Sequence, residues 1–416
     1  MSVKEVGAGG VYAGDSSTLR KMNVVAVLRL LYAAQAAAAL RADDDPGIDR
    51  YTVTEIAQAA GISRPTAEDV VDALITQGWL AEAPPLPRAG RRPAGRPART
   101  IWFDSQAGCV VGVDIALYWV RALVSDLAGR VIGRAEYPLA HGATVAERVA
   151  ATSTAVTEAL RLADREPGQI LAATAATVGI ARADGEVVRS AMPQLTGHNL
   201  AAMLGEFLPV PVKIANDMRA AVLAEYWVGA AAGCSSAVYL HVGRRLGSAY
   251  LIDGVSPLGH HGAAGEIPPE SGRRLIDAYR KLVSFTGVGV DELSRDQMLG
   301  VDPLTVFEAA RRGEVDAREA VADFADEFAA GIEGLVITVD PEVVVVGGGV
   351  VVAGDIAAEA IRSRLAAVCT FEPRVAVSPL GEGAAAMGAV RLALNDVEEM
   401  LFSDPFARTS AAQGSR

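Results

Sequence analysis

The first apolar run of the chain, residues 24–40, has the periodicity of an amphipathic helix. Leu28 and Tyr32 recur at helical spacing, and Ser17 can cap the start of the helix. The run also imitates an export signal, because basic residues precede it and small alanines end it. Arg29 in its middle argues against both export and a membrane span. We therefore expect a helix of a water-soluble domain, no membrane partner and a cytoplasmic protein.

Two shorter apolar stripes follow, at residues 53–57 and 67–75. Gly61 between them permits a tight turn, Ser63 can cap the second stripe, and Gly78 ends it. This order predicts a helix-turn-helix. The exposed first turn of the second helix is the part that enters the major groove of DNA in such units. The candidate DNA contacts there are Arg64, Thr66 and Glu68.

A basic loop then lies between two apolar segments, residues 78–80 and 100–103. The two segments have the pattern of a β-hairpin, so the helix-turn-helix is predicted to carry a wing. Guanidinium groups on a wing can pair with phosphates or enter a narrow minor groove. The candidate wing contacts are Arg88, Arg91, Arg92, Arg96 and Arg99. The alternative is an interdomain linker that is rich in arginine for solubility.

From Cys109 onward, apolar strand segments alternate with helical ones. The first half has strand segments at residues 110–113, 120–125, 131–139 and 170–180, with a long helix at 144–163 before the last of them. The second half repeats the theme at residues 237–242, 248–253 and 343–346, where the last segment ends in glycines. Two α/β halves predict a two-lobed body with a ligand site where the lobes meet.

Composition and charge limit the classes of protein and of partner that the chain allows. The chain has 416 residues, of which 51% are hydrophobic and 21% charged, so disorder is excluded. Three dispersed cysteines suit a reducing compartment and cannot build a disulfide framework. The net charge is −12, yet the first 100 residues hold 12 Lys and Arg against 11 Asp and Glu, and the remainder 26 against 39. A near-neutral front with a basic tip on an acidic body fits a nucleic-acid contact confined to the front.

Several ordered motifs resemble the ROK group of repressors and sugar kinases, within the sugar-kinase and actin superfamily. The resemblance covers nearly the whole chain. At the front, Leu19-Arg20 with Asn23 resembles the start of the ROK repressors. In the body, Gly112-Val113-Asp114 resembles the first phosphate strand, Asn216-Asp217 the catalytic pair and Val346-Gly347-Gly348-Gly349 the adenosine-side turn. The loop Gly262-Ala263-Ala264-Gly265-Glu266-Ile267 resembles the sugar loop, and residues 193–199 resemble the sugar-side loop. The resemblance implies an α/β fold: a winged helix-turn-helix followed by a two-lobed, actin-like and sugar-kinase-like (ribonuclease H-like) domain.

Both phosphate loops depart from the kinase pattern. Kinases of this group have a small, glycine-rich turn after the aspartate, which lets backbone amides approach phosphate oxygens. Here Asp114 is followed by the bulky segment 115–119. The second loop carries Arg244 and Arg245 where the group has a hydroxyl between glycines. We therefore expect no kinase activity and no cofactor, although the two arginines could bind an anion.

The zinc site of the group is also missing, since no cysteine lies between Cys234 and Cys369. Proline follows the sugar loop where the group has a histidine ligand, and His260 and His261 lack evident partners. We expect no bound metal. A partial effector pocket remains, formed by Asn216, Asp217 and Glu266 with Arg244 and Arg245. The Asn-Asp pair can equally cap the helix that follows it.

These observations predict a transcriptional regulator that binds a palindromic DNA operator as a homodimer or higher oligomer and responds to a sugar-derived effector. The expected domains are the winged helix-turn-helix (1–105), a first lobe (106–214), a second lobe with the C-terminal helix (215–400) and a flexible tail (401–416). Two other functions remain open: an active carbohydrate kinase with an added DNA-binding domain, and an actin-like scaffold that binds proteins.

Overall fold

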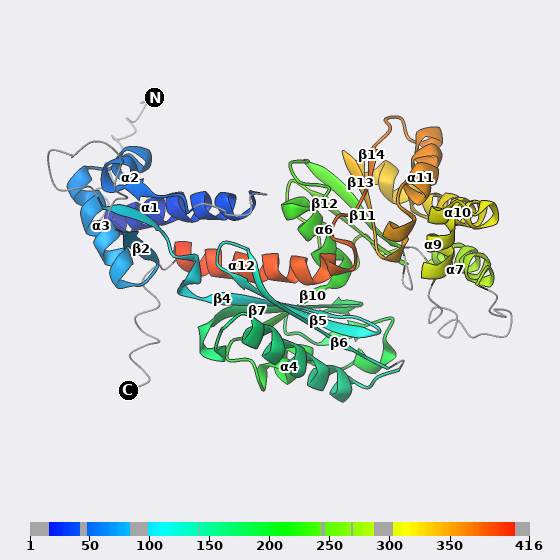
Figure 1. Cartoon of the computed structure of the whole chain (residues 1–416), viewed down its shortest axis with the longest axis horizontal. Helices are drawn as coiled ribbons and strands as arrows, with labels where there is room; N and C mark the ends of the chain where they lie inside the picture. The colour runs from blue at the N-terminus through cyan, green and yellow to red at the C-terminus, as the bar shows by residue number, and fades with distance from the viewer. Residues whose placement is uncertain are drawn as a thin grey trace, which may run out of the picture. The chain divides into compact units, whose positions relative to one another are not determined.

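The structure is a computed structural model that describes residues 16–41, 48–83, 99–140, 142–242, 246–267, 269–286 and 303–403 (Figure 1). Its contacts divide the chain into two compact units. Unit 1 comprises Met1–Ala107 with Asp396–Arg416, and unit 2 comprises Gly108–Asn395. Each unit has its own hydrophobic core, so the two are described separately.

Unit 1 is a winged helix-turn-helix, as the sequence predicts. Its helices are α1 (Ser16–Ala39), α2 (Val53–Ala60) and α3 (Arg64–Thr76), and its strands are β1 (Tyr51–Thr52), β2 (Leu80–Ala83) and β3 (Thr100–Phe103). The strands form one antiparallel sheet in the order β1-β3-β2. The predicted hairpin is the pair β2–β3. Its first strand begins at Leu80, whereas the sequence pattern placed it at residues 78–80, because Gly78 and Trp79 still belong to the turn after α3. The short strand β1, which pairs with the other edge of β3, has no counterpart in the sequence-based prediction.

Local signals explain where α2 and α3 begin and end. Thr52 and Glu55 form a reciprocal capping box at the start of α2. Gly61 ends α2 with φ at +66°, in the left-handed region, which residues with a side chain rarely adopt. The Ser63 hydroxyl accepts a hydrogen bond from the Thr66 amide at 3.3 Å and so caps α3. The turn geometry of a helix-turn-helix therefore follows from the residues themselves.

Helix α1 is long and apolar enough to cross a membrane, by length and composition alone. Within unit 1, however, one face of this helix is buried, and Val24, Val27 and Leu28 on it are fully covered. A helix that buries one stripe has a packing role in a domain core. Burial of this face accounts for part of the apolar composition of the helix.

The end of helix α12 (Ala384–Ser403) also belongs to unit 1 from Asp396 onward. The Phe402 ring makes edge contact with Tyr32 at 5.8 Å, and the Arg29 guanidinium lies 4.9 Å from its centroid. The Tyr32 hydroxyl donates to Glu398 at 2.8 Å. The prediction of a flexible tail from residue 401 is therefore wrong for residues 401–403, because these contacts with α1 order them.

The first sheet of unit 2 has the order β10-β7-β4-β5-β6. Its strands are β4 (Cys109–Ile115), β5 (Trp119–Asp126), β6 (Val131–Pro138), β7 (Ile170–Thr177) and β10 (Val212–Asn216). Helix α4 (Val145–Leu162) covers one face and α12 the other (Figure 1). A Cβ on Gly112 would meet the Val390 backbone nitrogen at 2.5 Å, so glycine permits this close packing of α12. This contact places α12 against the first sheet.

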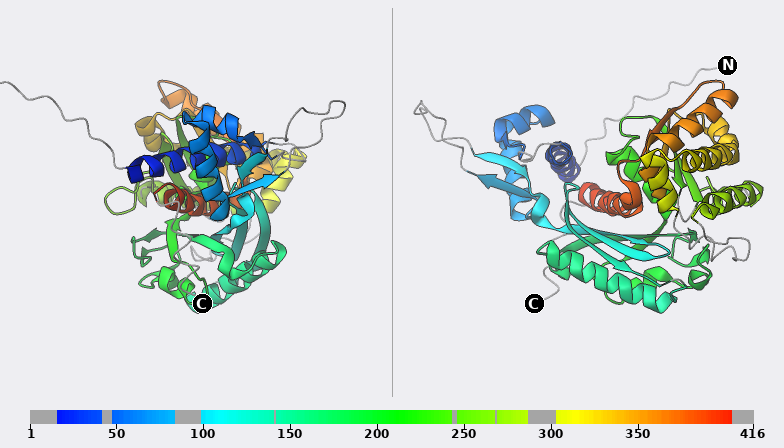
Figure 2. Two further views of the ribbon diagram at one scale, coloured as in Figure 1. Left: turned by 90° about the vertical axis from the view of Figure 1, so that its left-hand side faces the viewer. Right: turned by 45° about the vertical axis from the view of Figure 1, so that its right-hand side comes forward.

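The second sheet has the order β12-β11-β13-β14. Its strands are β11 (Ser236–Val242), β12 (Leu246–Ile252), β13 (Val343–Gly347) and β14 (Arg374–Val377). Helix α6 (Asp217–Val228) packs on one face. The other face holds a larger core with α7 (Pro269–Ser284), α9 (Leu304–Arg312), α10 (Val315–Val339) and α11 (Asp355–Val368), the last two side by side in Figure 2. Smaller elements, β8 (Ile180–Ala181), β9 (Val187–Arg189) and α5 (Leu200–Gly205), lie near the end of β10.

Candidate functional site

The first turn of α3 is exposed, as a recognition helix requires. The Arg64 side chain is 67% exposed, and its Nε lies 3.2 Å from Glu68 Oε1. The Thr66 hydroxyl lies 2.7 Å from the Ser63 hydroxyl. An exposed ion pair of this kind contributes little to stability, so Arg64 can exchange its partner at small cost. All three residues predicted for this turn therefore lie at the accessible end of α3.

Arg99 occupies the base of the wing rather than its tip. Its guanidinium donates to Asp72 Oδ1 of α3 at 2.6 Å and to Glu82 Oε2 of β2 at 3.1 Å. These carboxylates raise the pKa of Arg99 above its ordinary value. The contacts join the wing to the recognition helix and neutralise the charge that was expected to meet a phosphate. The other predicted wing contacts, Arg88, Arg91, Arg92 and Arg96, lie outside the described residues.

A further basic residue, missed in the sequence, lies beside the wing sheet. The exposed Arg50 guanidinium stacks 4.8 Å from the centroid of the Trp102 ring on β3. Stacking on an aromatic ring orients a guanidinium while leaving its edge free to donate hydrogen bonds. The sequence gives no indication that a single arginine before a strand lies near the wing. The pairing of β1 with β3 brings Arg50 there.

The predicted effector residues begin where β10 ends. Asn216 caps α6: its Oδ1 accepts from the Arg219 amide at 3.0 Å, and its Nδ2 donates to Gly179 O at 3.0 Å. Asp217 is only 1% exposed, and its Oδ1 accepts from the Met218 amide at 2.9 Å. Of the two roles foreseen for the pair, Asn216 therefore performs the capping role. The buried carboxylate of Asp217 is the member with the chemistry of a base or an anionic ligand contact.

The sugar-loop residue Glu266 comes close to Asp217. The pKa of Glu266 is raised, first because its surroundings desolvate the carboxyl and second because the Asp217 carboxylate repels a second negative charge. The Arg189 guanidinium at the end of β9 acts in the opposite direction. Arg189 is a neighbour that the sequence did not identify, because it is 77 residues from Glu266 in the chain. The Asp217 carboxylate is thus near enough to Glu266 to affect its ionisation, while Asn216 precedes Asp217 in the chain.

Two other expectations for this site have different outcomes. Arg244 and Arg245 lie outside the described residues. His260 and His261 are exposed and contact each other edge to face at 4.4 Å. Within the described part of the chain, no cluster of three or more His, Cys, Asp or Glu side chains could hold a metal ion. The segment 193–199 contributes a buried Leu195, and Asn199 caps α5.

The turn after Asp114 is rigidly built. The Ala116 amide donates to Trp119 O at 3.0 Å, so it is already engaged within the β4–β5 hairpin. Beneath the turn, the guanidinium of Arg148, only 1% exposed, donates to Ala116 O at 2.5 Å and to Leu117 O at 3.2 Å. A phosphate loop instead presents free amides to phosphate oxygens. This hairpin lacks that arrangement at Ala116.

A model of the ROK family matches residues 110–268 and 279–396, which is most of unit 2 and more than half of the chain. The chain belongs to the ROK family. Both its repressor-like front and its kinase-like body agree with this membership. The family prediction made from the motifs is confirmed.

Relatives of known name include both repressors and kinases. The xylose repressor of Caldicellulosiruptor bescii is 23% identical over 411 residues, covering 92% of this chain and 98% of the repressor. The transcriptional dual regulator NagC of Escherichia coli is 24% identical over 261 residues, covering 62% of this chain and 59% of NagC. The bifunctional enzyme NanE/NanK of Brucella melitensis is 32% identical, but the match covers only 51% of this chain and 42% of the enzyme.

Solved structures support the fold. A ROK family transcriptional regulator, described as a homolog of the E. coli MLC protein, matches with a TM-score of 0.67 at 18% identity, over 92% of this chain and 98% of that one. A ROK family glucokinase from Streptomyces griseus, in complex with glucose and AMPPNP, matches with a TM-score of 0.58 at 24% identity. The match covers 69% of this chain and 100% of the glucokinase. The regulator thus covers the winged unit as well, whereas the kinase leaves nearly a third of this chain unmatched.

Proposed function

We propose that this protein is a cytoplasmic transcriptional regulator that binds double-stranded DNA through unit 1 and senses a sugar-derived effector through unit 2. The observation that carries the proposal is the accessible first turn of α3 in a winged helix-turn-helix joined to a ROK body. Relatives named as repressors, which match along nearly the full length, support it. The acidic body keeps unit 2 away from DNA, while the arginine-rich stretch 84–100 of the near-neutral front supplies the phosphate contacts.

The proposal includes the absence of kinase activity. The support is the β4–β5 turn, where the bulky residues 117–119 replace a glycine-rich loop and the Ala116 amide is already engaged by Trp119 O. Kinases need backbone amides or cations aimed at the transferring phosphoryl group. Arg148 donates hydrogen bonds to the Ala116 and Leu117 oxygens and so stabilises the turn in this closed form.

The effector is proposed to bind at Asp217 and Glu266, with Arg189 as an additional polar contact. Arg244 and Arg245 are proposed to contact any phosphate group the effector carries. A buried carboxylate beside a second carboxylate suits a ligand with several hydroxyl donors, since each oxygen can accept two hydrogen bonds. Relatives named as xylose and N-acetylglucosamine repressors support the same ligand class. The protein is proposed to have one state that binds the operator tightly and one that binds it weakly. The effector changes the operator affinity only as far as it binds one of these states more tightly than the other.

The operator is proposed to be a palindrome bound by a homodimer, with half-sites spaced by about 10 bp or a multiple of that. Genome-wide recovery of bound DNA identifies the site. Fluorescence anisotropy with the recovered duplex then measures the affinity at several salt concentrations. We expect a steep fall with salt and a saturable change on adding one sugar of a pentose, hexose and amino-sugar panel. Recovery of no enriched sequence, or a salt-independent affinity, contradicts the proposal.

An active carbohydrate kinase is the second candidate, because the family's acidic residues are retained. These are Asp114, Asp217 and Glu266, together with Asn216. A coupled assay of ATP consumption against the same sugar panel distinguishes the two functions. Sugar-dependent turnover by the wild type that is lost in Asp217→Asn establishes the kinase; we expect neither protein to turn over ATP.

A further inference from the structure

Unit 2 contains a cavity that neither Asp217 nor Glu266 lines. Its volume is about 350 Å³, within the range of small-ligand pockets. The β4–β5 turn, the end of β11, the start of α9 and the loop after β13 line it, and the loop before α12 completes it. None of the residues assigned above to the effector lines this cavity.

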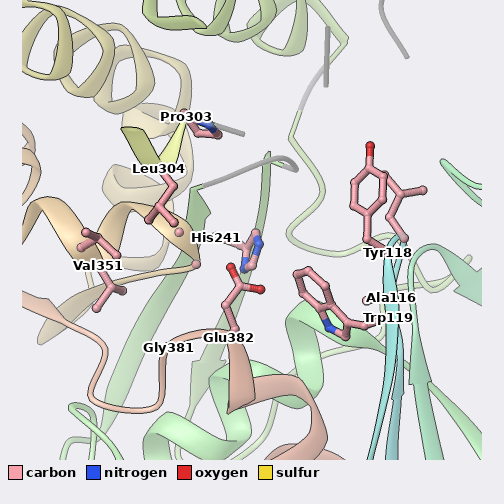
Figure 3. Close-up of a pocket in the computed structure, with 13 residues that line it drawn as sticks. Ala116, Tyr118, Trp119, His241, Pro303, Leu304, Val351, Gly381 and Glu382 are labelled. Atoms are coloured by element: carbon pink, nitrogen blue, oxygen red, sulfur yellow. The ribbon is translucent and has the colours of Figure 1, made fainter. Parts of the chain in front are cut away.

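The lining is mainly apolar and aromatic, with two polar groups that converge. Leu304, Val351 and Val352 provide aliphatic surface on one side. Figure 3 shows the His241 imidazole and the Glu382 carboxylate pointing toward one another, with the Trp119 ring beside them. His241 is buried and Glu382 half-buried, so both groups act in partly desolvated surroundings.

The positions of these side chains are set by the surrounding packing. Arg121 lies over the Trp119 ring, 5.6 Å from its centroid, and its charge is balanced by Glu136 at 2.6 Å. The Arg121 guanidinium also donates to the backbone oxygen of Glu382. Gly348 allows the opposite wall to approach, since a Cβ there would lie 3.0 Å from His241 Cε1. The cavity is thus a built feature of the fold.

The chemistry of this lining disfavours phosphate. Among the described residues that line the cavity there is no Lys or Arg, whereas the Glu382 carboxylate repels an anion. The Ala116 amide is already used within its hairpin. An aromatic wall, by contrast, stacks on a flat ring, and a carboxylate beside an aromatic face attracts a protonated amine.

We propose that this cavity binds a flat aromatic ligand that carries a protonated amine, as a second ligand site independent of the sugar-derived effector. The ring stacks on Trp119 between the aliphatic side chains, and the amine donates to the Glu382 carboxylate. The proposal concerns the cavity alone and stands whether or not the protein senses a sugar.

Two probes of equal shape and opposite charge test it: tryptamine and indole-3-propionate, titrated calorimetrically into the full-length protein. We expect saturable 1:1 binding of tryptamine that is at least about tenfold tighter than binding of the acid, the effect of one partly buried charge contact. Glu382→Gln should reduce the preference to about twofold or less. Glu372→Gln makes the same change at an exposed site that does not line the cavity and should leave the preference intact.

Trp119 supplies a second test. Trp119→Ala should weaken both probes about tenfold, and Trp119→Phe, which keeps a ring and the hairpin, should retain most of the affinity. Lack of saturable tryptamine binding overturns the proposal. So does equal binding of the acid, competition by ATP, or a preference that survives Glu382→Gln.

Discussion

Arg148 gives the sharpest test of how the β4–β5 turn is held. Its guanidinium donates to three backbone oxygens, those of Ala116 and Leu117 in the turn and of Ala143 before α4. Each hydrogen bond from a charged donor contributes about 1.5–3 kcal/mol. Burial of the cation opposes this gain and lowers the pKa of Arg148. Because Arg148→Met keeps the volume but leaves three oxygens without their donor, we expect a loss of roughly 2–4 kcal/mol in the free energy of unfolding.

Urea denaturation followed by tryptophan fluorescence and circular dichroism measures this loss. Arg161→Met is the matched control, since Arg161 lies on the same helix, is 65% exposed and forms an ion pair with Glu158 on the adjacent turn of the helix. Such an exposed pair is screened by solvent and contributes little to stability, so we expect Arg161→Met to unfold at nearly the same urea concentration as the wild type. Equal losses in the two variants, or a loss below about 1 kcal/mol for Arg148→Met, refute the idea that this arginine holds the turn.

Three other predictions concern DNA binding and pH. Arg64→Ala should weaken operator binding by about 1–3 kcal/mol in fluorescence anisotropy, whereas Arg182→Ala on unit 2 should leave it unchanged. Arg99→Met should leave the salt dependence of binding unaltered and lower stability by about 0.5–1 kcal/mol, because its partners are carboxylates; a slope reduced by about 1 contradicts this. Burial chiefly raises the pKa of Glu225, so the stability that its protonated form contributes is lost as the pH rises through the folded-state pKa. In urea denaturation at a series of pH values, Glu225→Gln should therefore gain less stability on acidification than the wild type, and an unchanged gain contradicts this.

Much of unit 1 could be predicted because its signals are local. Ser63 and Gly61 act on their immediate neighbours, so the cap and the turn follow from the residue types. The strand pattern around the wing likewise predicts β2 and β3. In unit 2, continuous apolar runs predict buried strands such as β4 and β13, which have every residue buried.

The effector site could be predicted only in part. The motifs singled out Asp217 and Glu266, and the fold brings them together. Arg189 escaped notice, because it lies far from Glu266 along the chain. The cavity beside Trp119 was foreseen only in part: the motifs named residues 115–119 and Gly348-Gly349, but not His241, Leu304 or Glu382, which come from distant segments. Asn216 shows the limit in another way: the sequence allows two roles, and only the positions of the Arg219 amide and Gly179 decide that it caps α6.

The amino-acid sequence by itself determined the helix caps, the turns, the strand runs and the family, because each depends on neighbouring residues or on an ordered set of motifs. Only the tertiary structure decided the partners of charged side chains. Arg148 lies in a helix whose spacing is ordinary, yet it is buried because a hairpin 32 residues earlier supplies its acceptors. Arg99 lies in a basic stretch, yet it binds two carboxylates brought to it by folding. Hydrogen bonds and ion pairs act over a few ångströms of space regardless of separation along the chain, so these assignments required the fold.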